Sequence, residues 1–326
     1  MALPIPVVDI SGFDGGPATA RRQVLEEVTA ACEETGFLVI VGHGVTDEVI
    51  ASMYRVTQEF FALPRAEKQR CTPEGWDRYC GFAGIDRGRA SGRTDLKEMF
   101  HANRFDGPDD AVAAGYPWEV GALQAPNLWP ERPEGFTAAW RRYYRAMETL
   151  ADRMNRIFAC CLSLPEDWFR DKLDNHLSNL GANWYPPQPV EPEPGVVRCS
   201  QHIDFSALTI LYQDDAPGGL EVRDRSGAWR PVPPLPGSFV VNLGDLMNRW
   251  TSDRWQATPH RVVNPPRPAA HTGRISIPYF QMPNWDAVIE CAPTCLPESG
   301  VAHYPAVVAG PHAEERRAGT RPQMAV

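Results

Sequence analysis

The sequence predicts an α+β protein whose first half is mainly helical and whose second half is built of β-strands. Helical periodicity is strongest from Phe136 to Leu164, where large apolar side chains follow a helical repeat. After Asn175 short β-branched or aromatic segments alternate with Pro and Gly turns, which is typical of a sandwich or a barrel. Strands and helices do not alternate regularly, so a parallel βαβ sheet is not expected.

The first half of the chain contains several short predicted elements. Apolar spacing predicts strands at 7–10 and 37–41 and helices at 17–35, 45–61 and 65–69. Gly36 ends the first of these helices, and Pro64 ends the second. Residues 71–130 are rich in Gly, Pro and charged side chains. A loop of that length inside a compact domain is typical of a lid or a binding loop.

The second half is predicted to contain strands at 179–185, 201–213, 219–223, 229–232, 238–243, 258–263 and 274–281. The chain ends in a polar stretch from residue 310, which we expect to be a mobile tail. The 326 residues are 43% hydrophobic and 22% charged, which is enough apolar material for a sizeable core.

The overall charge and the cysteines indicate which classes of partner and which cellular compartment to expect. The net charge is −9, which argues against a nucleic-acid partner and against an anionic membrane surface. No apolar run approaches the roughly 20 residues that span a bilayer, and the first residues lack the basic start of a secretory signal. The eight cysteines contain no Cys-x-x-Cys pair, so we expect free thiols in a cytoplasmic protein.

The tripeptide His202-Ile203-Asp204 is a candidate metal-binding motif. In an extended strand, residues i and i+2 point to the same face, so an imidazole and a carboxylate project together. His260, on a partner strand, would add a second imidazole. Two histidines and one carboxylate leave positions open on a metal, which suits non-haem Fe(II) that reacts with oxygen. A rival His312-Ala313-Glu314 motif lies in the polar tail and has no later histidine to complete it.

Two further pairs of polar residues share the i, i+2 spacing. Arg274 and Ser276 place a guanidinium and a hydroxyl on one strand face, a combination suited to a carboxylate. Asn183 and Tyr185 place an amide and a phenol on another. Polar groups on otherwise apolar strands are costly to bury without partners. A metal and an anionic co-substrate inside a barrel would satisfy all of these groups.

These motifs belong to an ordered set that covers nearly the whole chain. In its first half the set comprises Ile5-Pro6-Val7-Val8-Asp9, Gly36-Phe37, Gly42-His43-Gly44-Val45, Phe60-Phe61-Ala62-Leu63-Pro64, Asp95-Leu96-Lys97-Glu98 and Asn127-Leu128-Trp129-Pro130. It continues with Asn183-Trp184-Tyr185-Pro186-Pro187, His202-Ile203-Asp204, Gly218-Gly219-Leu220-Glu221-Val222, Asn242-Leu243-Gly244-Asp245, His260-Arg261-Val262 and Arg274-Ile275-Ser276. With these motifs the chain resembles the isopenicillin N synthase-like family of Fe(II)/2-oxoglutarate-dependent dioxygenases.

The resemblance implies a fold and a division of the chain. The expected core is a double-stranded β-helix, a jelly roll like that of the cupins, flanked by helices. The whole chain, 1–326, would be a single catalytic domain. Residues 1–174 would form a mixed, mainly helical region with a lid loop, residues 175–308 the β-helix core, and residues 309–326 a polar tail.

The resemblance also implies a role for each motif residue. His202, Asp204 and His260 match the iron ligands, Arg274 and Ser276 match the groups that hold the distal carboxylate of 2-oxoglutarate, and Asn183 and Tyr185 match its further polar contacts. Two departures from the family pattern stand out. The stretch from His260 to Arg274 is longer than usual, and Trp184 stands where a tyrosine is common.

The implied reaction uses Fe(II), 2-oxoglutarate and O2 to oxidise, most often hydroxylate, an unactivated C–H bond of a small metabolite, with release of succinate and CO2. One alternative is an oxidase or cyclase of the isopenicillin N synthase type, which needs no 2-oxoglutarate and in which Arg274 and Ser276 would grip a carboxylate of the substrate. Another is a barrel in which the three residues hold zinc and no oxidation occurs.

Residues that contact the substrate are expected in the lid, 76–101, and on the last strand of the barrel. Candidates are Tyr79, Phe82 and Arg93 in the lid, and Phe280, which follows Ser276 on the same strand face. The lid is basic and aromatic while the protein is acidic, which favours a substrate with an anionic group.

The protein is expected to be a monomer or a weak dimer. The other histidines (His43, His101, His176, His271 and His303) are interpreted as structural or surface residues, and Asn242 and Asp245 as caps of a turn.

Overall fold

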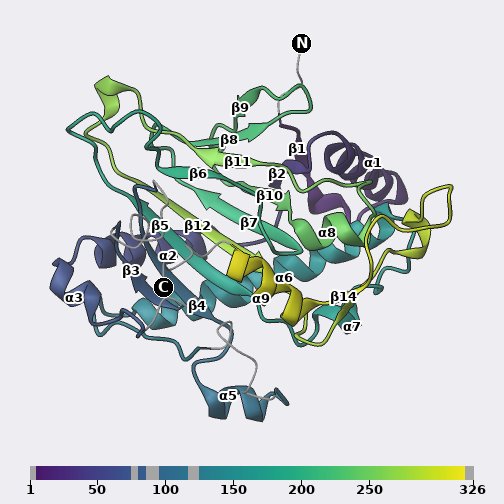
Figure 1. The fold of residues 1–326 in the computed structure, drawn as a ribbon, viewed down its shortest axis with the longest axis horizontal. Helices are drawn as coiled ribbons and strands as arrows, with labels where there is room; N and C mark the ends of the chain where they lie inside the picture. The colour runs from purple at the N-terminus through teal and green to yellow at the C-terminus, as the bar shows by residue number, and fades with distance from the viewer. Residues whose placement is uncertain (1–4, 75–79, 86–94, 117–124, 320–326) are drawn as a thin grey trace.

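The computed structural model describes residues 5–74, 80–85, 95–116 and 125–319 (Figure 1). The helices are α1 (Ala18–Glu34), α2 (Asp47–Phe61), α3 (Arg65–Gln69), α5 (Pro108–Ala113), α6 (Phe136–Cys161), α7 (Arg170–Leu173), α8 (Asp245–Trp250) and α9 (Ala309–Gly319). Short 3-10 turns are η1 (Ile10–Gly12), η3 (Arg267–Ala269) and η4 (Pro293–Cys295).

The strands begin with β1 (Val7–Asp9), β2 (Phe37–Val41), β3 (Gly81–Ala83), β4 (Glu98–Asn103), β5 (Asn179–Tyr185), β6 (Cys199–His202) and β7 (Leu208–Gln213). They continue with β8 (Leu220–Arg223), β9 (Trp229–Pro231), β10 (Phe239–Leu243), β11 (His260–Val262), β12 (Arg274–Gln281), β13 (Val288–Ile289) and β14 (Val307–Val308).

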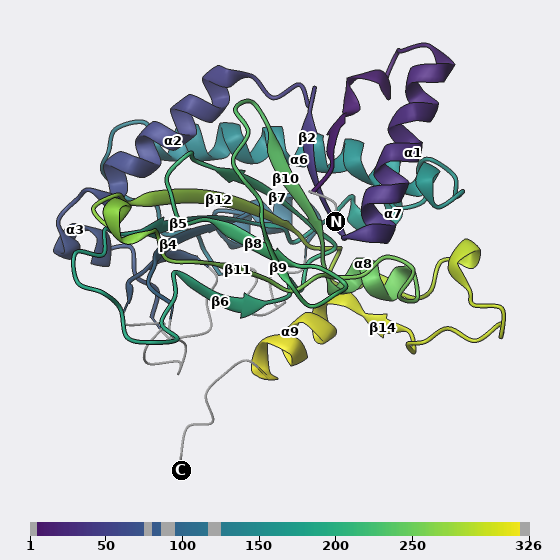
Figure 2. The same cartoon turned by 90° about the horizontal axis from the view of Figure 1, so that it is seen from above.

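Two sheets face each other in the jelly-roll core that the sequence predicts. The large sheet has the order β1-β2-β10-β7-β12-β5-β4-β3, and the small sheet has the order β6-β11-β8-β9. The small sheet lies over one face of the large one (Figure 2). Neighbouring strands are antiparallel except β1 and β2. The short hairpin β13–β14 stands apart from both sheets.

Helices α2 and α6 cover the other face of the large sheet (Figure 2). The apolar residues of α6 follow the helical repeat because one side of the helix is fully buried against α2 and the sheet. On the sheet, Leu180, Ile210 and Ile277 point to this side and belong to the main core. Their neighbours in sequence therefore point to the inner face between the two sheets, because successive residues of a strand alternate.

The structure differs from the predictions in three places. The predicted strand 201–213 is split into β6 and β7 by a non-regular segment, 203–207. The segment 71–130, expected as an irregular loop, contains β3, β4 and α5 within its described part, and β3 and β4 extend the large sheet. From residue 309 the expected polar tail instead forms helix α9 up to Gly319, because Ala309 and Ala313 give that helix an apolar side that is buried.

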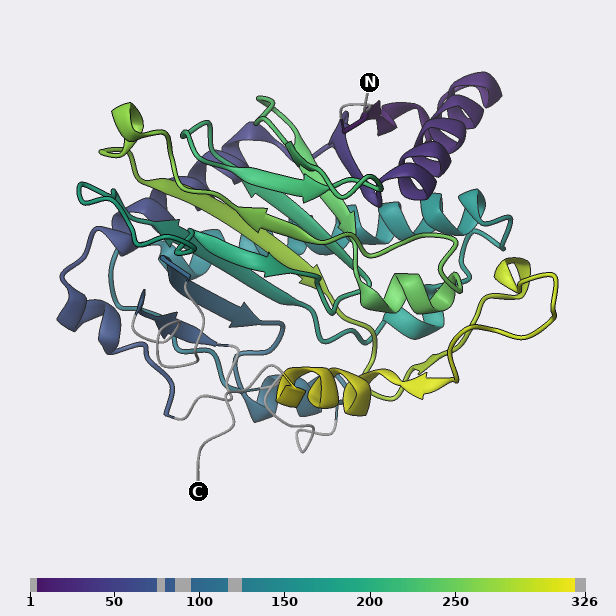
Figure 3. The same ribbon diagram turned by 45° about the horizontal axis from the view of Figure 1, so that its top comes forward.

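Helix α9 is docked beside α8 rather than projecting into solvent (Figure 3). His312 Nε2 lies 3.1 Å from a carboxylate oxygen of Asp245, at the start of α8, and Arg316 lies 3.6 Å from the other. The Arg316 guanidinium also stacks over the ring of Phe205, 5.5 Å from its centroid. The rival His312-x-Glu314 motif is therefore on a helix, and its histidine is engaged with Asp245.

The cysteines and the helices agree with two expectations about the chain. All eight cysteines fall within the described residues, and each is a free thiol. Among the described helices, none combines the length and the apolar character that crossing a membrane requires.

Trp140 tests how strongly the helical layer stabilises the fold. Its ring is fully buried and packs at 5.0 Å from the ring of Phe100 and at 5.2 Å from that of Phe136. We expect Trp140→Ala to lower the free energy of unfolding by about 3–5 kcal/mol, because it leaves a large cavity. Denaturant unfolding measures this loss. The control Trp229→Ala removes a partly exposed ring from β9 and should cost far less; equal losses would contradict the assignment of the core.

Candidate metal centre and co-substrate site

His202, Asp204 and His260 converge on one point of the inner face. His260 is paired directly with His202 across β11 and β6, and their ring centroids are 4.2 Å apart. The Nε2 atom of each ring lies 3.6 Å from Asp204 Oδ1. One ligand atom from each residue lies within 4.8 Å of the others. The structure therefore brings together the three residues that the sequence singles out.

Hydrogen bonds from behind fix which nitrogen of each imidazole faces the centre. His202 Nδ1 lies 2.8 Å from the carbonyl oxygen of Ser200, and His260 Nδ1 lies 3.2 Å from that of Thr258. A carbonyl can only accept, so both Nδ1 atoms carry the proton and both Nε2 atoms present a lone pair. Burial, together with the nearby His202, lowers the pKa of the His260 imidazole to about 4, so this ring is neutral at physiological pH.

The carboxylate of Asp204 is held by its other oxygen. Thr209 Oγ1 donates to Asp204 Oδ2 at 2.6 Å, and Asn242 Nδ2 donates to the same oxygen at 2.8 Å. Burial by itself raises the pKa of the Asp204 carboxyl. Positive charge on either imidazole, when it is protonated, and these hydrogen bonds outweigh burial, and the pKa is lowered. Asp204 is therefore a carboxylate, and its Oδ1 atom is left facing the point where the three residues converge.

This donor set fits a bound metal ion. Each imidazole Nε2 lies 3.6 Å from Asp204 Oδ1, and these electron-rich atoms repel unless a cation lies between them. A metal about 2.1 Å from each ligand allows ligands up to about 4.2 Å apart, so the spacing is suitable. Two histidines and one carboxylate form the set that non-haem Fe(II) oxygenases use, with positions left for other ligands. His202, whose side chain is 31% exposed, keeps the centre open on one side.

Arg274 lies at the other end of the same face, and its side chain is 1% exposed. Its Nη2 donates to Gln213 Oε1 at 3.0 Å, and its guanidinium stacks on the ring of Tyr185 at 5.4 Å. Nη1 is buried and has no hydrogen-bond partner in the described part of the chain. A buried guanidinium donor without a partner is costly, and a carboxylate would satisfy it.

An ion pair with Asp214 does not account for Arg274. The closest approach between them is 3.9 Å, while Asp214 Oδ2 accepts a hydrogen bond of 2.6 Å from the backbone N–H of Ile275. Burial raises the pKa of the Asp214 carboxyl, although the N–H of Ile275 and the charge of Arg274 act in the opposite direction. The interpretation of Arg274 as an ordinary buried ion pair is therefore not supported by the geometry.

The sheet register brings the other predicted polar residues to Arg274. Ser276 is paired with Asn183, and Arg274 with Tyr185, across β12 and β5. Asn183 Nδ2 lies 3.4 Å from Ser276 Oγ. Paired residues in an antiparallel sheet share a face, so all four side chains lie on the inner face together.

The predicted substrate contacts have different outcomes. Phe280 lies on the inner face of β12, paired with Thr209, which bonds to Asp204. Phe82 is 2% exposed and packs in the main core against Phe60, because β3 has joined the large sheet, so a substrate contact by this ring is not supported. Tyr79 and Arg93 lie outside the described residues.

Sequence reasoning missed the residues that hold the ligands in place. Asn242, expected to cap a turn, instead donates to Asp204, and Thr209 and Gln213 were not singled out. Asn242 and Thr209 lie on inner-face positions of β10 and β7 between buried apolar neighbours, and Gln213 ends β7. A single polar residue at an inward position of an otherwise apolar strand is the signal that could have found the first two.

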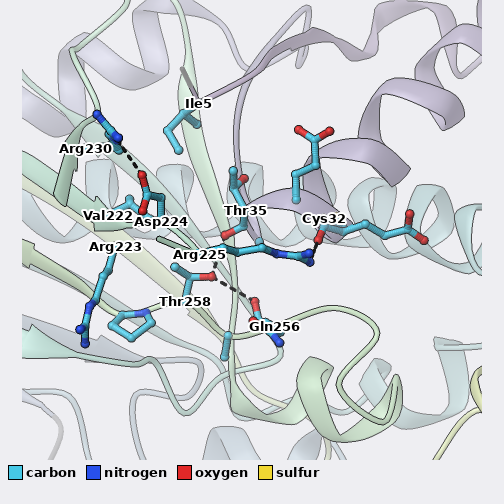
Figure 4. A pocket seen from close by; sticks show the side chains of 15 residues that line it. Ile5, Cys32, Thr35, Val222, Arg223, Asp224, Arg225, Arg230, Gln256 and Thr258 are labelled. Atoms are coloured by element: carbon cyan, nitrogen blue, oxygen red, sulfur yellow. Dashed lines mark hydrogen bonds and ion pairs between the residues drawn. The ribbon is translucent and has the colours of Figure 1, made fainter. Parts of the chain in front are cut away.

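A separate small cavity lies outside this site. It has a volume of about 130 Å³ and is lined by the end of α1, the β8–β9 turn and residues 256–259. Arg230 Nε donates to Asp224 at 2.7 Å, and the Thr258 hydroxyl donates to the carbonyl oxygen of Thr35 at 2.6 Å (Figure 4). No residue of the triad lines it, and these polar groups are already partnered within the protein.

Comparisons with known proteins agree with this geometry. Residues 5–132 match the family model described as non-haem dioxygenase in morphine synthesis, N-terminal, and residues 175–283 match the model of the 2OG-Fe(II) oxygenase superfamily. The chain is 32% identical to a homoarginine-6-hydroxylase of Oryza sativa subsp. japonica over 94% of both chains. It is 35% identical to the 2-oxoglutarate-dependent dioxygenase citB of Monascus ruber, over 86% of this chain and 85% of that protein.

Solved structures show the same fold. A Caulobacter crescentus protein described as a 2OG-Fe(II) oxygenase family member superposes with a TM-score of 0.84 at 28% identity, over 97% of this chain and 99% of that one. A full-length Neurospora crassa protein, crystallised in complex with alpha-KG and thymine, superposes with a TM-score of 0.83 at 27% identity, over 97% of each chain.

Thr209 tests whether the hydrogen bonds to Asp204 matter for metal binding. Thr209→Val keeps the shape of the side chain but removes the hydroxyl that donates to Asp204 Oδ2. We expect Fe(II) affinity to fall about 10–100-fold, as is typical when a group that orients a ligand is removed. Anaerobic Fe(II) titration measures this change. Thr57→Val, at a fully buried threonine of α2, is the matched control and should leave the affinity unchanged; a loss of the same size there would point to a general folding effect.

Proposed function

This chain belongs to the 2OG-Fe(II) oxygenase family, and we propose that it hydroxylates a small metabolite bearing an anionic group, using the residues described above. As a member of the family it is a 2-oxoglutarate-dependent dioxygenase that uses Fe(II). The observation that carries the proposed residue roles is the meeting of two imidazoles and a carboxylate at one point. At the other end of the same face lies a buried guanidinium donor that has no hydrogen-bond partner among the described residues.

We assign the iron to His202, Asp204 and His260. The Nδ1–H groups and the two donors to Asp204 Oδ2 orient the three ligand atoms before the metal arrives, so little rearrangement is needed on binding. Bound Fe(II), with 2-oxoglutarate and O2, supplies the oxidation of a C–H bond, which is coupled to loss of CO2 and formation of succinate.

We assign the far carboxylate of 2-oxoglutarate to Arg274 and Ser276. The Nη1 donor of Arg274 and the hydroxyl of Ser276 lie on one strand face and match the two oxygens of a carboxylate. Tyr185 and Asn183 are the polar neighbours that complete this end. The apolar residues Leu211 and Val240 between this end and the triad keep the face largely dry, which strengthens the charge pairing.

The anionic character of the substrate is a proposal from the sequence. It depends on basic residues of the lid, such as Arg93, that lie outside the described residues. The relatives act on chemically different molecules, since one is a homoarginine hydroxylase and one was crystallised with thymine. Both of these molecules are small metabolites, and this class of substrate is all that we carry over from the relatives to this chain.

An oxidase that works without 2-oxoglutarate would also place a carboxylate at Arg274, one belonging to its substrate. The relatives are described as 2-oxoglutarate-dependent enzymes, which supports the co-substrate at this end. The two enzyme types are distinguished by whether turnover depends on added 2-oxoglutarate. An oxidase that works without this co-substrate would consume O2 in its absence.

Arg274→Ala tests the co-substrate role. We expect the KM for 2-oxoglutarate to rise about 10–150-fold, because charge-assisted hydrogen bonds of about 1.5–3 kcal/mol are lost. Succinate release at increasing 2-oxoglutarate concentrations measures the KM, and Fe(II) titration should give an unchanged affinity. Arg267→Ala, which removes another arginine in the loop before β12, serves as the control and should leave the KM unchanged. An unaltered KM in Arg274→Ala would refute the assignment.

A further inference from the structure

We infer that Arg198 is a second cation of the co-substrate end, a positioning residue that orients Arg274 and adds its positive charge to the attraction of the far carboxylate of 2-oxoglutarate. The inference rests on the proposed function, because it extends the assignment of that carboxylate to Arg274. Arg198 lies outside the family motifs described above. It directly precedes β6, and its side chain is fully buried.

The guanidinium of Arg198 ties two other segments of the backbone to its own. Nη1 donates to the carbonyl oxygens of Pro217 at 2.6 Å and Gly218 at 2.7 Å, in the turn before β8. Nη2 donates to the carbonyl oxygen of Thr272 at 2.9 Å. Thr272 lies two residues before Arg274, which is the first residue of β12. Arg198 therefore fixes the stretch of backbone from which the Arg274 side chain projects.

The ring of Tyr185 links Arg198 to Arg274. The guanidinium carbon of Arg198 lies 5.8 Å from the centroid of that ring, and the guanidinium carbon of Arg274 lies 5.4 Å from it. Tyr185 is 2% exposed and is paired with Arg274 across β5 and β12. Because an aromatic face attracts cations, one buried ring orients both side chains.

No adjacent carboxylate neutralises Arg198 within the described part of the chain. Its hydrogen-bond acceptors there are the three backbone carbonyls, and its buried Nε has no acceptor among the same residues. Burial and the positive charge of Arg274 lower the pKa of the Arg198 guanidinium to about 10, although Asp214 acts in the opposite direction. The group is still charged at physiological pH. Two buried cations close together are costly unless an anion joins them.

The charges at this end leave room for one anion. Lys97 Nζ lies 3.4 Å from Asp95 Oδ2, so these two charges offset each other. Among the described residues, Asp214 is the further carboxylate near Arg198 and Arg274. One positive charge therefore remains, and the far carboxylate of 2-oxoglutarate balances it. This excess depends on Arg198, because the charges of Arg274 and Asp214 alone would cancel.

Two variants separate the charge of Arg198 from its hydrogen bonds. Arg198→Lys keeps the charge, while Arg198→Gln keeps an N–H donor without a charge. Calorimetric titration of the anaerobic, Fe(II)-loaded full-length protein with 2-oxoglutarate measures the dissociation constant without turnover. We expect Arg198→Gln to weaken binding about tenfold, as one buried charge acts on another nearby, and Arg198→Lys to stay within about threefold of the wild type. Unchanged binding in Arg198→Gln, or an equal loss in both variants, would overturn the inference.

Arg267→Gln is the matched control. Arg267 also donates to two backbone carbonyls, those of Gln188 at 3.0 Å and Pro189 at 3.1 Å, and it lies in the same loop before β12. Unlike Arg198 it is exposed, so its charge is screened by solvent. The dissociation constant of Arg267→Gln should therefore equal that of the wild type. A loss as large as in Arg198→Gln would show that the loop, and not the buried charge, governs binding, and would contradict the inference.

A second pair of variants applies if Arg198→Gln does not fold. Asp214→Asn removes the opposing charge, and its amide oxygen can still accept from the backbone N–H of Ile275. We expect Asp214→Asn to bind 2-oxoglutarate more tightly than the wild type. The double variant Arg198→Gln/Asp214→Asn loses one charge of each sign and should return to the wild-type affinity. A double variant that binds as tightly as Asp214→Asn, or about tenfold more weakly than the wild type, would overturn the role of the Arg198 charge.

Failure of the proposed function is seen separately in the same titration. If Arg274→Ala binds 2-oxoglutarate as tightly as the wild type, or the wild type does not bind it, the assignment of the co-substrate end is wrong. If Arg274→Ala weakens binding and Arg198→Gln does not, only the inference about Arg198 fails.

Discussion

The close approach of two imidazole lone pairs and a carboxylate oxygen is the constraint on which the structure depends. Neutral nitrogen lone pairs and an anionic oxygen do not gather in a protein interior without a cation to offset their repulsion. The protein holds them together from behind, through carbonyls at Ser200 and Thr258 and through donors at Thr209 and Asn242. The two facing sheets bring together the separate segments that supply these groups.

The register of the large sheet determines where each polar side chain lies along the inner face. One row of directly paired residues runs from Asn242 to Asn103, and its first two members, Asn242 and Thr209, bond to Asp204. A second row, with Gln213, Ser276 and Asn183, lies nearer to Arg274. The residues that bond to Asp204 and the residues around Arg274 thus lie at different levels of the same strands. Because a slip by one residue would turn both rows outward, the buried helical layer on the other face also fixes the site.

Much of the fold can be predicted from the sequence where the local pattern and the tertiary context agree. The alternation in 179–185 and 274–281 predicts both strands to the residue, because clear turns bound them. The break after His202 escapes prediction because residues 203–207 lie between β-forming segments, and only the bonds that Asp204 makes to other strands reveal why the chain leaves the sheet there. The alternation in β10 marks Asn242 as an inward polar residue, but its bond to Asp204, 38 residues away in the sequence, depends on the fold.

Helix α9 has a consequence for how such enzymes diverge. Its His312 and Arg316 contact Asp245, and the backbone N–H of Asp245 donates to the carbonyl of Asp204 at 2.9 Å. Two contacts thus separate the last helix from Asp204, the proposed metal ligand. Substitutions acquired near the carboxyl end of the chain can therefore tilt or shift the ligand, and retune the reactivity of the metal, while every strand of the barrel keeps its sequence.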